Sequence, residues 1–265
     1  MAHGIGGIKA AGLRPFAERF VAEGYFVVVF DYRHWGSSTG EPRELLDISR
    51  QLQDYRTAIS FTASQKSVDP ELVFAWGTSF AGMHIVELAA TEKLAGAIAQ
   101  CPLVDGLGAA MKLPLRLSLK LAGTAALDKI GSMVGRDPIY VPVAVEPGEL
   151  GMLATSDSVT GMKMLVANCP VDWPNRITAR SAISLPWHRP FRRAGSAKCP
   201  ILMVVATHDT LVPTRPALRV AEMAPHGEMF RSSGGHFDVY EGGIAHSEAI
   251  EAEVAFLHRH SAESR

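Results

Sequence analysis

The chain has 265 residues, of which 47% are hydrophobic and 20% are charged. That length and balance fit one globular domain, or one domain with an inserted subdomain, and they exclude a disordered chain. The formal net charge is −1, from 26 basic and 27 acidic side chains, and there is no long basic run. We therefore expect a small-molecule substrate and no nucleic-acid partner.

Five apolar segments predict β-strands, because runs of β-branched and aromatic residues bounded by turn residues are typical of strands buried on both faces. In chain order they are 26–30 (FVVVF), 72–76 (LVFAW), 95–100 (AGAIAQ), 201–206 (ILMVVA) and 228–232 (EMFRS). Segments with apolar residues at helical spacing alternate with them, at 12–23, 44–63, 80–91, 213–224 and 243–260. This alternation predicts an α/β fold with a doubly wound, mostly parallel sheet.

Residues 103–192 interrupt the alternation, because they separate two predicted strands and are too long for a simple crossover. The segment is rich in leucine and methionine and is broken by proline and glycine. We interpret it as a helical cap inserted between core segments 1–102 and 193–265. The alternative is that it only adds core packing and has no role in substrate binding.

A candidate nucleophile, Ser79, stands between a predicted strand and a predicted helix. A serine on such a sharp turn is held in a strained backbone conformation with its hydroxyl exposed. Small neighbours are required because strand and helix pass close together, and Gly77 and Ala81 meet that requirement. Taken alone, Ser79 would be better explained as a helix N-cap, and only its context favours a nucleophile.

A serine nucleophile needs a base, and the base needs an orienting carboxylate. Asp209 comes just past strand 201–206, and His236 lies in a glycine-rich loop just past strand 228–232. Because parallel strands present their carboxyl ends at one edge of a sheet, we expect both residues to meet Ser79 there. The sequence therefore predicts a catalytic triad of Ser79, His236 and Asp209.

Asp105, which follows strand 95–100, is an alternative acid for this triad. Four other ionisable residues near these motifs are interpreted as packing, local hydrogen-bonding or surface groups: His84, His208, Asp238 and His246.

Acyl transfer also requires hydrogen-bond donors for the developing oxyanion. One candidate is the backbone N–H of Phe80, the residue after the nucleophile. The glycine-rich stretch at 3–7 (HGIGG) can turn its amides inward, and we take the N–H of Ile5 as the second donor, with Gly4 as the alternative. A flexible terminus without function would produce the same composition.

Together with the stretch at 31–38 (DYRHWGSS), these motifs resemble the α/β-hydrolase superfamily, and serine esterase-like members in particular. The resemblance implies the chain order serine, acid, histidine, hydrolysis of a carboxylic ester through an acyl-enzyme, and no metal or organic cofactor. The match is imperfect at Ala81, where the family has glycine. An acyltransferase or a serine peptidase would use the same triad, and a truncated, non-catalytic hydrolase-like protein is a further alternative.

The family also places a strand directly before the His-Gly stretch, whereas only two residues precede His3. We therefore expect N-terminal strands to be missing and the native chain to begin further upstream, or another subunit to donate a strand.

The three cysteines, Cys101, Cys169 and Cys199, are an odd number without metal-ligand spacing. With no signal sequence and no apolar run of about 20 residues, they predict a cytoplasmic protein without a membrane span. The oligomeric state is not predicted.

Overall fold

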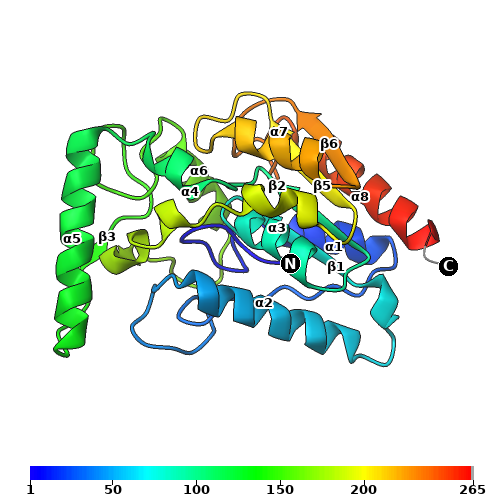
Figure 1. Cartoon of the computed structure of the whole chain (residues 1–265), viewed down its shortest axis with the longest axis horizontal. Helices are drawn as coiled ribbons and strands as arrows, with labels where there is room; N and C mark the ends of the chain where they lie inside the picture. Colours follow the sequence, from blue (N-terminus) through cyan, green and yellow to red (C-terminus); the bar gives the residue numbers. More distant parts are fainter. Residues whose placement is uncertain (264–265) are drawn as a thin grey trace.

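The computed structural model describes residues 1–263 and contains a parallel four-stranded sheet in the order β1-β2-β5-β6 (Figure 1). The strands are β1 Phe74–Thr78, β2 Gly96–Gln100, β5 Ile201–Ala206 and β6 Gly227–Ser232. Thr78 pairs with Gln100, and Gln100 pairs with Val204. The strands therefore end side by side, and the predicted doubly wound α/β fold is confirmed.

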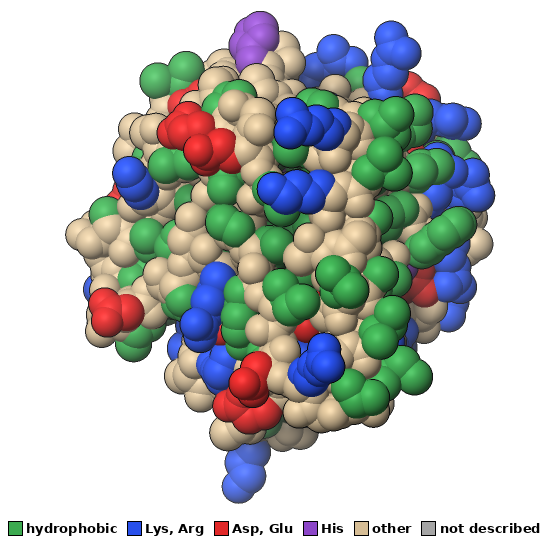
Figure 2. Space-filling view, turned by 90° about the vertical axis from the view of Figure 1, so that its left-hand side faces the viewer, with side chains coloured by type: hydrophobic (Ala, Val, Ile, Leu, Met, Phe, Trp, Pro, Cys, Tyr) green, Lys and Arg blue, Asp and Glu red, His purple; other side chains and the backbone are tan. Residues whose placement is uncertain are grey.

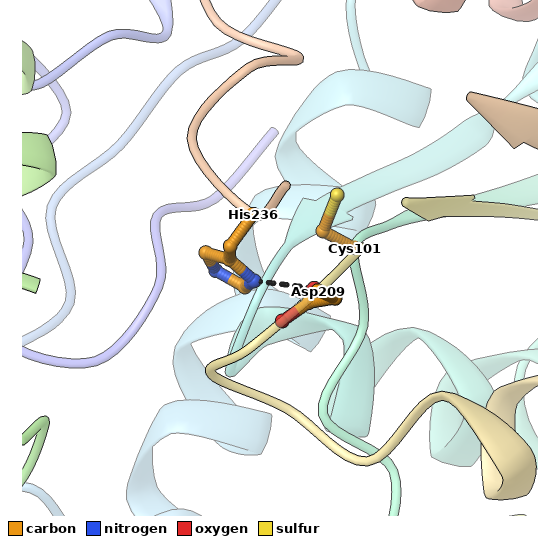
Figure 3. A group of neighbouring side chains, drawn as sticks. All are labelled: Cys101, Asp209 and His236. Atoms are coloured by element: carbon orange, nitrogen blue, oxygen red, sulfur yellow. Dashed lines mark hydrogen bonds and ion pairs between the residues drawn. The ribbon is translucent and has the colours of Figure 1, made fainter. Parts of the chain in front are cut away.

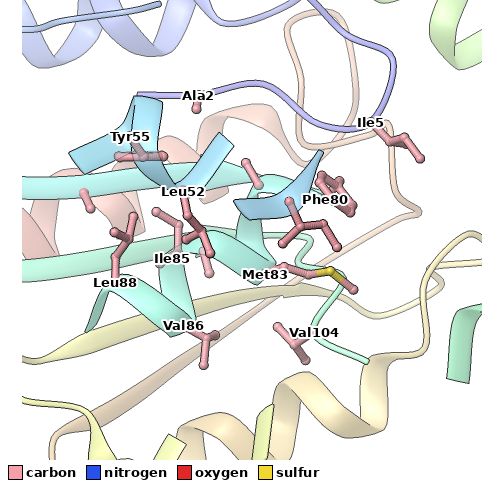
Figure 4. Close-up of a cluster of buried hydrophobic side chains, with 14 of the residues drawn as sticks. Ala2, Ile5, Leu52, Tyr55, Phe80, Met83, Ile85, Val86, Leu88 and Val104 are labelled. Atoms are coloured by element: carbon pink, nitrogen blue, oxygen red, sulfur yellow. The ribbon is translucent and has the colours of Figure 1, made fainter. Parts of the chain in front are cut away.

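Helices cover both faces of the sheet because successive strand residues point to opposite sides. One face packs against α2 Ile48–Ala63, α3 Ala81–Thr91 and α7 Thr214–Met223, in the cluster of which Figure 4 shows a part. The other face packs against α1 Arg14–Ala22 and α8 His246–Glu263. In β5, for example, Met203 belongs to the first cluster and Val204 to the second.

Two helix ends illustrate how local chemistry sets these boundaries. The predicted helix 44–63 begins at Ile48 instead, because the Asp47 side chain accepts a hydrogen bond from Arg50 N at 3.1 Å and caps the first turn. Helix α1 ends as expected before Gly24, whose φ of +88° is the left-handed conformation that glycine adopts readily after a helix.

The predicted strand 26–30 is wrong: residues 25–30 have no regular secondary structure and form no ladder with the sheet. The Met1 amine donates to Val28 O at 2.7 Å, and Ala2 forms a single parallel bridge with Gly77. Beyond these contacts, a cavity of about 570 Å³, lined by Tyr25–Val28 and Val73–Phe74 among others, separates the segment from β1. A segment without a hydrogen-bonded neighbour is not a strand. The expectation of a longer native chain stays a prediction.

The segment predicted as a cap lies beyond the carboxyl ends of the strands, with α5 Leu115–Met133 at its outer edge (Figure 1). It also contains α4 Gly106–Ala110, α6 Ser158–Val166 and an antiparallel pair, β3 Tyr140–Val141 with β4 Ile177–Thr178. The short 3₁₀ turns are η1 Pro70–Leu72, η2 Ala179–Ala182, η3 Leu185–Trp187 and η4 Pro190–Ser196. Phe191 and Ala194 of η4 belong to the same hydrophobic cluster as Ala125 and Val141 of this segment, so the boundaries at 103 and 192 stay a prediction.

Within residues 1–263, none of the helices combines the length and the apolar character that crossing a bilayer requires.

Candidate active site

Ser79 occupies the turn between β1 and α3, as the sequence predicted. Its φ is +55°, a left-handed conformation that is strained for a residue with a side chain, and it is only 8% exposed. A Cβ at Gly77 would lie 2.8 Å from Ile85 Cγ1 and 3.0 Å from Ala81 Cβ. The close crossing of strand and helix therefore requires the glycine.

The backbone of Ser79 is anchored to the last residue of β2 and to the segment that follows it. Ser79 N donates to Gln100 O at 2.8 Å, and Ser79 O accepts from Leu103 N at 2.9 Å. These two bonds satisfy the backbone groups of a residue that belongs to neither the strand nor the helix. The side chain is consequently held in place by the sheet itself.

His236 and Asp209 lie against Ser79 although they are distant in sequence. His236 Nε2 is 3.0 Å from Ser79 Oγ, and His236 Nδ1 is 2.7 Å from Asp209 Oδ2. The His236 and Asp209 side chains are 2% and 1% exposed, so water does not compete for these hydrogen bonds. The structure thus brings the three residues predicted from sequence into one hydrogen-bonded chain.

The loop after β5 orients Asp209. Its second carboxylate oxygen, Oδ1, accepts hydrogen bonds from Leu211 N at 2.9 Å and Val212 N at 2.8 Å. With Oδ1 occupied by backbone donors, Oδ2 is left to accept from His236. This places the proton of the neutral imidazole on Nδ1 and leaves Nε2 free to accept from the Ser79 hydroxyl.

Cys101 completes a compact group with Asp209 and His236, whose potential ligand atoms all lie within 4.8 Å of one another (Figure 3). A metal ion would require a thiolate and an imidazole nitrogen without another partner. Burial and, next, the charge of Asp209 raise the pKa of the Cys101 thiol well above its usual value. Both nitrogens of His236 already have partners, so this donor set fits a hydrogen-bonded triad better than a metal site.

The glycine-rich stretch near the N-terminus forms a β-turn against the nucleophile. Gly7 N donates to Gly4 O at 3.2 Å, and Gly6 has a φ of +67° at the third position, as type II turns require. A Cβ at Gly4 would lie 2.9 Å from Ser79 Cβ, so the turn touches the serine. Within residues 1–263, the backbone amides of Ile5 and Phe80 donate to no protein acceptor. Their role as oxyanion donors stays a prediction.

Trp173, in the cap, holds this turn from outside and was missed in the sequence. Its Nε1 donates to Gly6 O at 2.6 Å. The two residues are 167 positions apart, and a lone tryptophan in an irregular segment carries no motif that would reveal such a contact.

Asp31, from the stretch at 31–38, fixes the chain that leaves the turn. Its carboxylate accepts from Lys9 N at 2.6 Å and from Ser37 N at 3.0 Å. Burial alone would raise the pKa of Asp31, but these backbone donors, together with His3 and the Ser37 hydroxyl, outweigh burial and the pKa is lowered. The stretch therefore anchors the segment that follows the turn.

The alternative acid, Asp105, is turned to another partner. Its two oxygens accept from Arg189 Nε at 2.6 Å and Arg189 Nη2 at 3.0 Å, a bidentate ion pair that ties the start of α4 to the segment before η4. Asp105 therefore forms its ion pair within the cap, whereas Asp209 contacts His236.

The four remaining ionisable groups lie outside the hydrogen-bonded chain. His208 is exposed, and Asp238 accepts from Gly235 N at 2.7 Å, as a local partner within the histidine loop. His84 is fully buried beside Gln51, and burial lowers its pKa to about 3. His246 was expected at the surface but is half-buried at the start of α8, where its ring bonds to Val239 O.

A cavity of about 780 Å³ opens at Ser79 beneath the cap. Its walls are predominantly apolar and come mainly from α4, α5 and η3, and Lys112 is the one ionisable residue among those that line it. A volume of this size accommodates a small organic molecule, and the apolar walls favour a hydrocarbon portion.

The chain resembles known proteins along nearly its whole length. A family model described as serine aminopeptidase, S33 matches residues 1–244. The quorum-quenching protein AidA of Acinetobacter baumannii is 39% identical over 260 residues, which cover 98% of this chain and 85% of that protein. The thiohydrolase aneE of Aspergillus aculeatus is 27% identical over 267 residues, covering 97% of this chain and 83% of that protein. The crystal structure of the α/β-hydrolase GrgF from Penicillium sp. sh18 aligns with a TM-score of 0.83 at 24% identity, covering 99% of this chain and 89% of that one.

Proposed function

The chain belongs to the α/β-hydrolase enzymes of the serine aminopeptidase S33 family, and on that premise we propose that it cleaves a carboxylic ester by a Ser-His-Asp acyl-enzyme mechanism. The proposed substrate is a small molecule with an apolar acyl or alcohol part.

One observation carries the proposal: a strained, buried serine whose Oγ is 3.0 Å from an imidazole nitrogen that is itself oriented by a carboxylate. A helix N-cap, the alternative explanation for Ser79, needs neither the positive φ nor the histidine. A nucleophile needs both, because the turn exposes the hydroxyl and the base removes its proton.

In the first step, Ser79 Oγ attacks the carbonyl carbon of the ester while His236 Nε2 takes the hydroxyl proton. The negative charge moves to the carbonyl oxygen, where the N–H groups of Ile5 and Phe80 would receive it. Asp209 stabilises the imidazolium through the 2.7 Å contact with Nδ1. When the tetrahedral intermediate collapses, the ester bond breaks and the alcohol leaves with the proton from His236.

In the second step, water attacks the acyl-enzyme and gives its proton to His236 Nε2. Collapse of the second intermediate releases the carboxylic acid and returns the proton to Ser79 Oγ. Every proton that moves is transferred through Nε2, so the tautomer fixed by Asp209 serves both steps.

Thioester hydrolysis is a second candidate, favoured by the resemblance to a protein named a thiohydrolase. The same acyl-enzyme would form, and only the leaving group would change from an alcohol to a thiol. Transfer of the acyl group to an alcohol or an amine instead of water uses the same residues, so the acceptor has to be determined by kinetics.

The test is covalent labelling of the folded 265-residue chain with a fluorophosphonate, read by intact mass. Ser79→Ala should abolish labelling, whereas Ser118→Ala, which removes another hydroxyl from the wall of the same cavity, should leave it unchanged. Steady-state rates on matched oxygen esters, thioesters and amides, with and without an added alcohol, then identify the leaving group and the acceptor. A folded protein that is not labelled, or that is labelled equally after Ser79→Ala, would overturn the proposal.

A further inference from the structure

The outer side of the cap exposes large apolar side chains of a kind that proteins usually bury. We call six of them the cap face: Met111, Leu115, Leu119, Leu127, Ile130 and Met133, each at least 61% exposed. Trp187 of η3, at the mouth of the cavity, is 85% exposed. Figure 2 looks onto the side of the molecule where α5 lies and shows apolar side chains interspersed with basic ones and with a smaller number of acidic ones.

Helix α5 carries large apolar side chains on its exposed side as well as on the side that packs against the protein, which is unusual for a helix at a surface. Its inner side lines the cavity with residues that include Leu121 and Ala125. On its outer side, Leu115, Leu119 and Ile130 fall within about 60° of one another when successive residues advance by about 100°. Ala122 and Ala126 also line the cavity, and by the same geometry they fall beside and within this stripe, so the exposed apolar stripe of α5 adjoins the cavity wall.

The outer stripe is flanked by positive charge. By the same helical geometry, Lys129 lies about 40° to one side of it, and Arg116 and Lys120 lie about 40° to 80° to the other. Residues 111–136 contain five Lys or Arg, all exposed and none in an ion pair within residues 1–263: Lys112, Arg116, Lys120, Lys129 and Arg136.

No exposed acid balances these charges within the same segment. Its one carboxylate, Asp128, is 1% exposed and accepts from Ile139 N at 2.9 Å and Arg180 N at 2.8 Å. The nearest exposed acidic residues along the chain are Asp137, directly after Arg136, and Glu146 and Glu149, in the loop that lines the cavity through Pro147 and Gly148.

We propose that the cap face binds an anionic lipid surface. An apolar stripe between rows of lysine and arginine is the pattern of helices that lie in a bilayer interface, with apolar tips among the acyl chains and cations at the headgroups. A second copy packed on the same face would bring two basic helices together, which is unfavourable. The proposal adds to the esterase proposal and does not depend on it.

Binding in this orientation would place the mouth of the 780 Å³ cavity, with Trp187 at its rim, against the lipid. An apolar substrate could then pass from the bilayer to Ser79 without its hydrocarbon part crossing water.

The experiment is flotation of the full chain with vesicles of phosphatidylcholine alone or of phosphatidylcholine with 30% phosphatidylglycerol. It uses the Ser79→Ala protein, so that turnover does not alter the lipid and the result is independent of the triad. We expect binding to the anionic vesicles that weakens with salt.

Two variants each have a matched control outside the cap. Lys120→Glu should weaken binding about 30-fold, since each charge near an anionic surface contributes about five-fold and the reversal changes two; Lys66→Glu should not. Ile130→Ser should also weaken binding, whereas Ile244→Ser, at a side chain that is 79% exposed, should not.

Equal binding to neutral and anionic vesicles would overturn the proposal, as would binding that neither cap variant reduces. Absence of vesicle binding would also overturn it. In that case, dimerisation lost in Ile130→Ser, measured by sedimentation, would assign the cap face to a second copy. Salt-sensitive capture of an acidic acyl-carrier protein would assign it to such a protein.

Discussion

Trp173→Phe tests whether the cap positions the amides that face Ser79. The substitution keeps an aromatic ring in the half-buried position but removes the Nε1–H that donates to Gly6 O at 2.6 Å. Gly6 follows Ile5 directly, so releasing its carbonyl lets the Ile5 amide turn away from the oxyanion.

The expected size of the effect follows from the hydrogen bond. Its net contribution is about 0.5–1.5 kcal/mol, and leaving the Gly6 carbonyl unpaired costs about 1–3 kcal/mol. If loosening of the turn removes about 1.4 kcal/mol of transition-state stabilisation, kcat falls about ten-fold. Complete loss of one oxyanion donor, roughly 100- to 1000-fold, is the upper bound. KM should change little, because the ground-state carbonyl depends less on the donor.

The assay is steady-state hydrolysis of a p-nitrophenyl ester, with kcat and KM determined separately and the free energy of unfolding measured by urea titration. Trp187→Phe is the matched control, because Trp187 borders the cavity at Ser79, is 85% exposed, and within residues 1–263 its indole Nε1 donates no hydrogen bond to protein. Its kcat should equal that of the wild type. A folded Trp173→Phe protein with wild-type kcat would refute the positioning role.

Three further outcomes are expected. Gly6→Ala should lower the free energy of unfolding by at least about 1 kcal/mol and lower kcat in the same esterase assay, because φ is +67° and the new Cβ would lie 2.5 Å from Val143; unchanged stability would contradict the strained turn. Burial raises the pKa of Glu253 to about 8, so the folded protein favours the protonated form. The free energy of unfolding therefore falls as pH rises from about 4.5 towards 8, by at most about 1.4 kcal/mol per pH unit. Glu253→Gln, which still accepts from Trp76 Nε1, should remove this slope in urea titrations at pH 5 and pH 8; an unchanged slope would place its origin elsewhere. Ala125→Leu fills part of the cavity and should reduce kcat/KM on long acyl esters about four-fold for each methylene excluded, leaving acetate esters unaffected; equal losses on both would show that the acyl group lies elsewhere.

The candidate site could be predicted because its signals are local. The serine turn requires small neighbours in the same pentapeptide, and Gly77 is within two residues of Ser79. Asp209 and His236 each follow a strand-like run, and parallel strands present their ends at one edge regardless of what lies between them. In the structure, His236 Nε2 lies 3.0 Å from Ser79 Oγ, and His236 Nδ1 lies 2.7 Å from Asp209 Oδ2. The catalytic roles of these residues stay predictions, to be tested with the labelling experiment.

The prediction of a strand at 26–30 is wrong because strand formation depends on a neighbouring segment that is not local in the sequence. The β-branched and aromatic residues at 26–30 have the composition of a strand, but a strand exists only when a neighbour supplies hydrogen bonds. Here a cavity of about 570 Å³ separates part of the segment 26–30 from β1. Composition carries no information about whether that neighbour is present.

The sequence by itself determined the α/β alternation, the turn chemistry at Ser79 and the order of the candidate triad, because propensity, glycine requirement and strand ends act over a few residues. Only the tertiary structure decided that Trp173 supports Gly6 across 167 positions, that Asp105 is paired with Arg189, and that the exposed apolar stripe of α5 adjoins the cavity wall. Such contacts depend on which surfaces the packed fold brings together, and no local pattern encodes that choice.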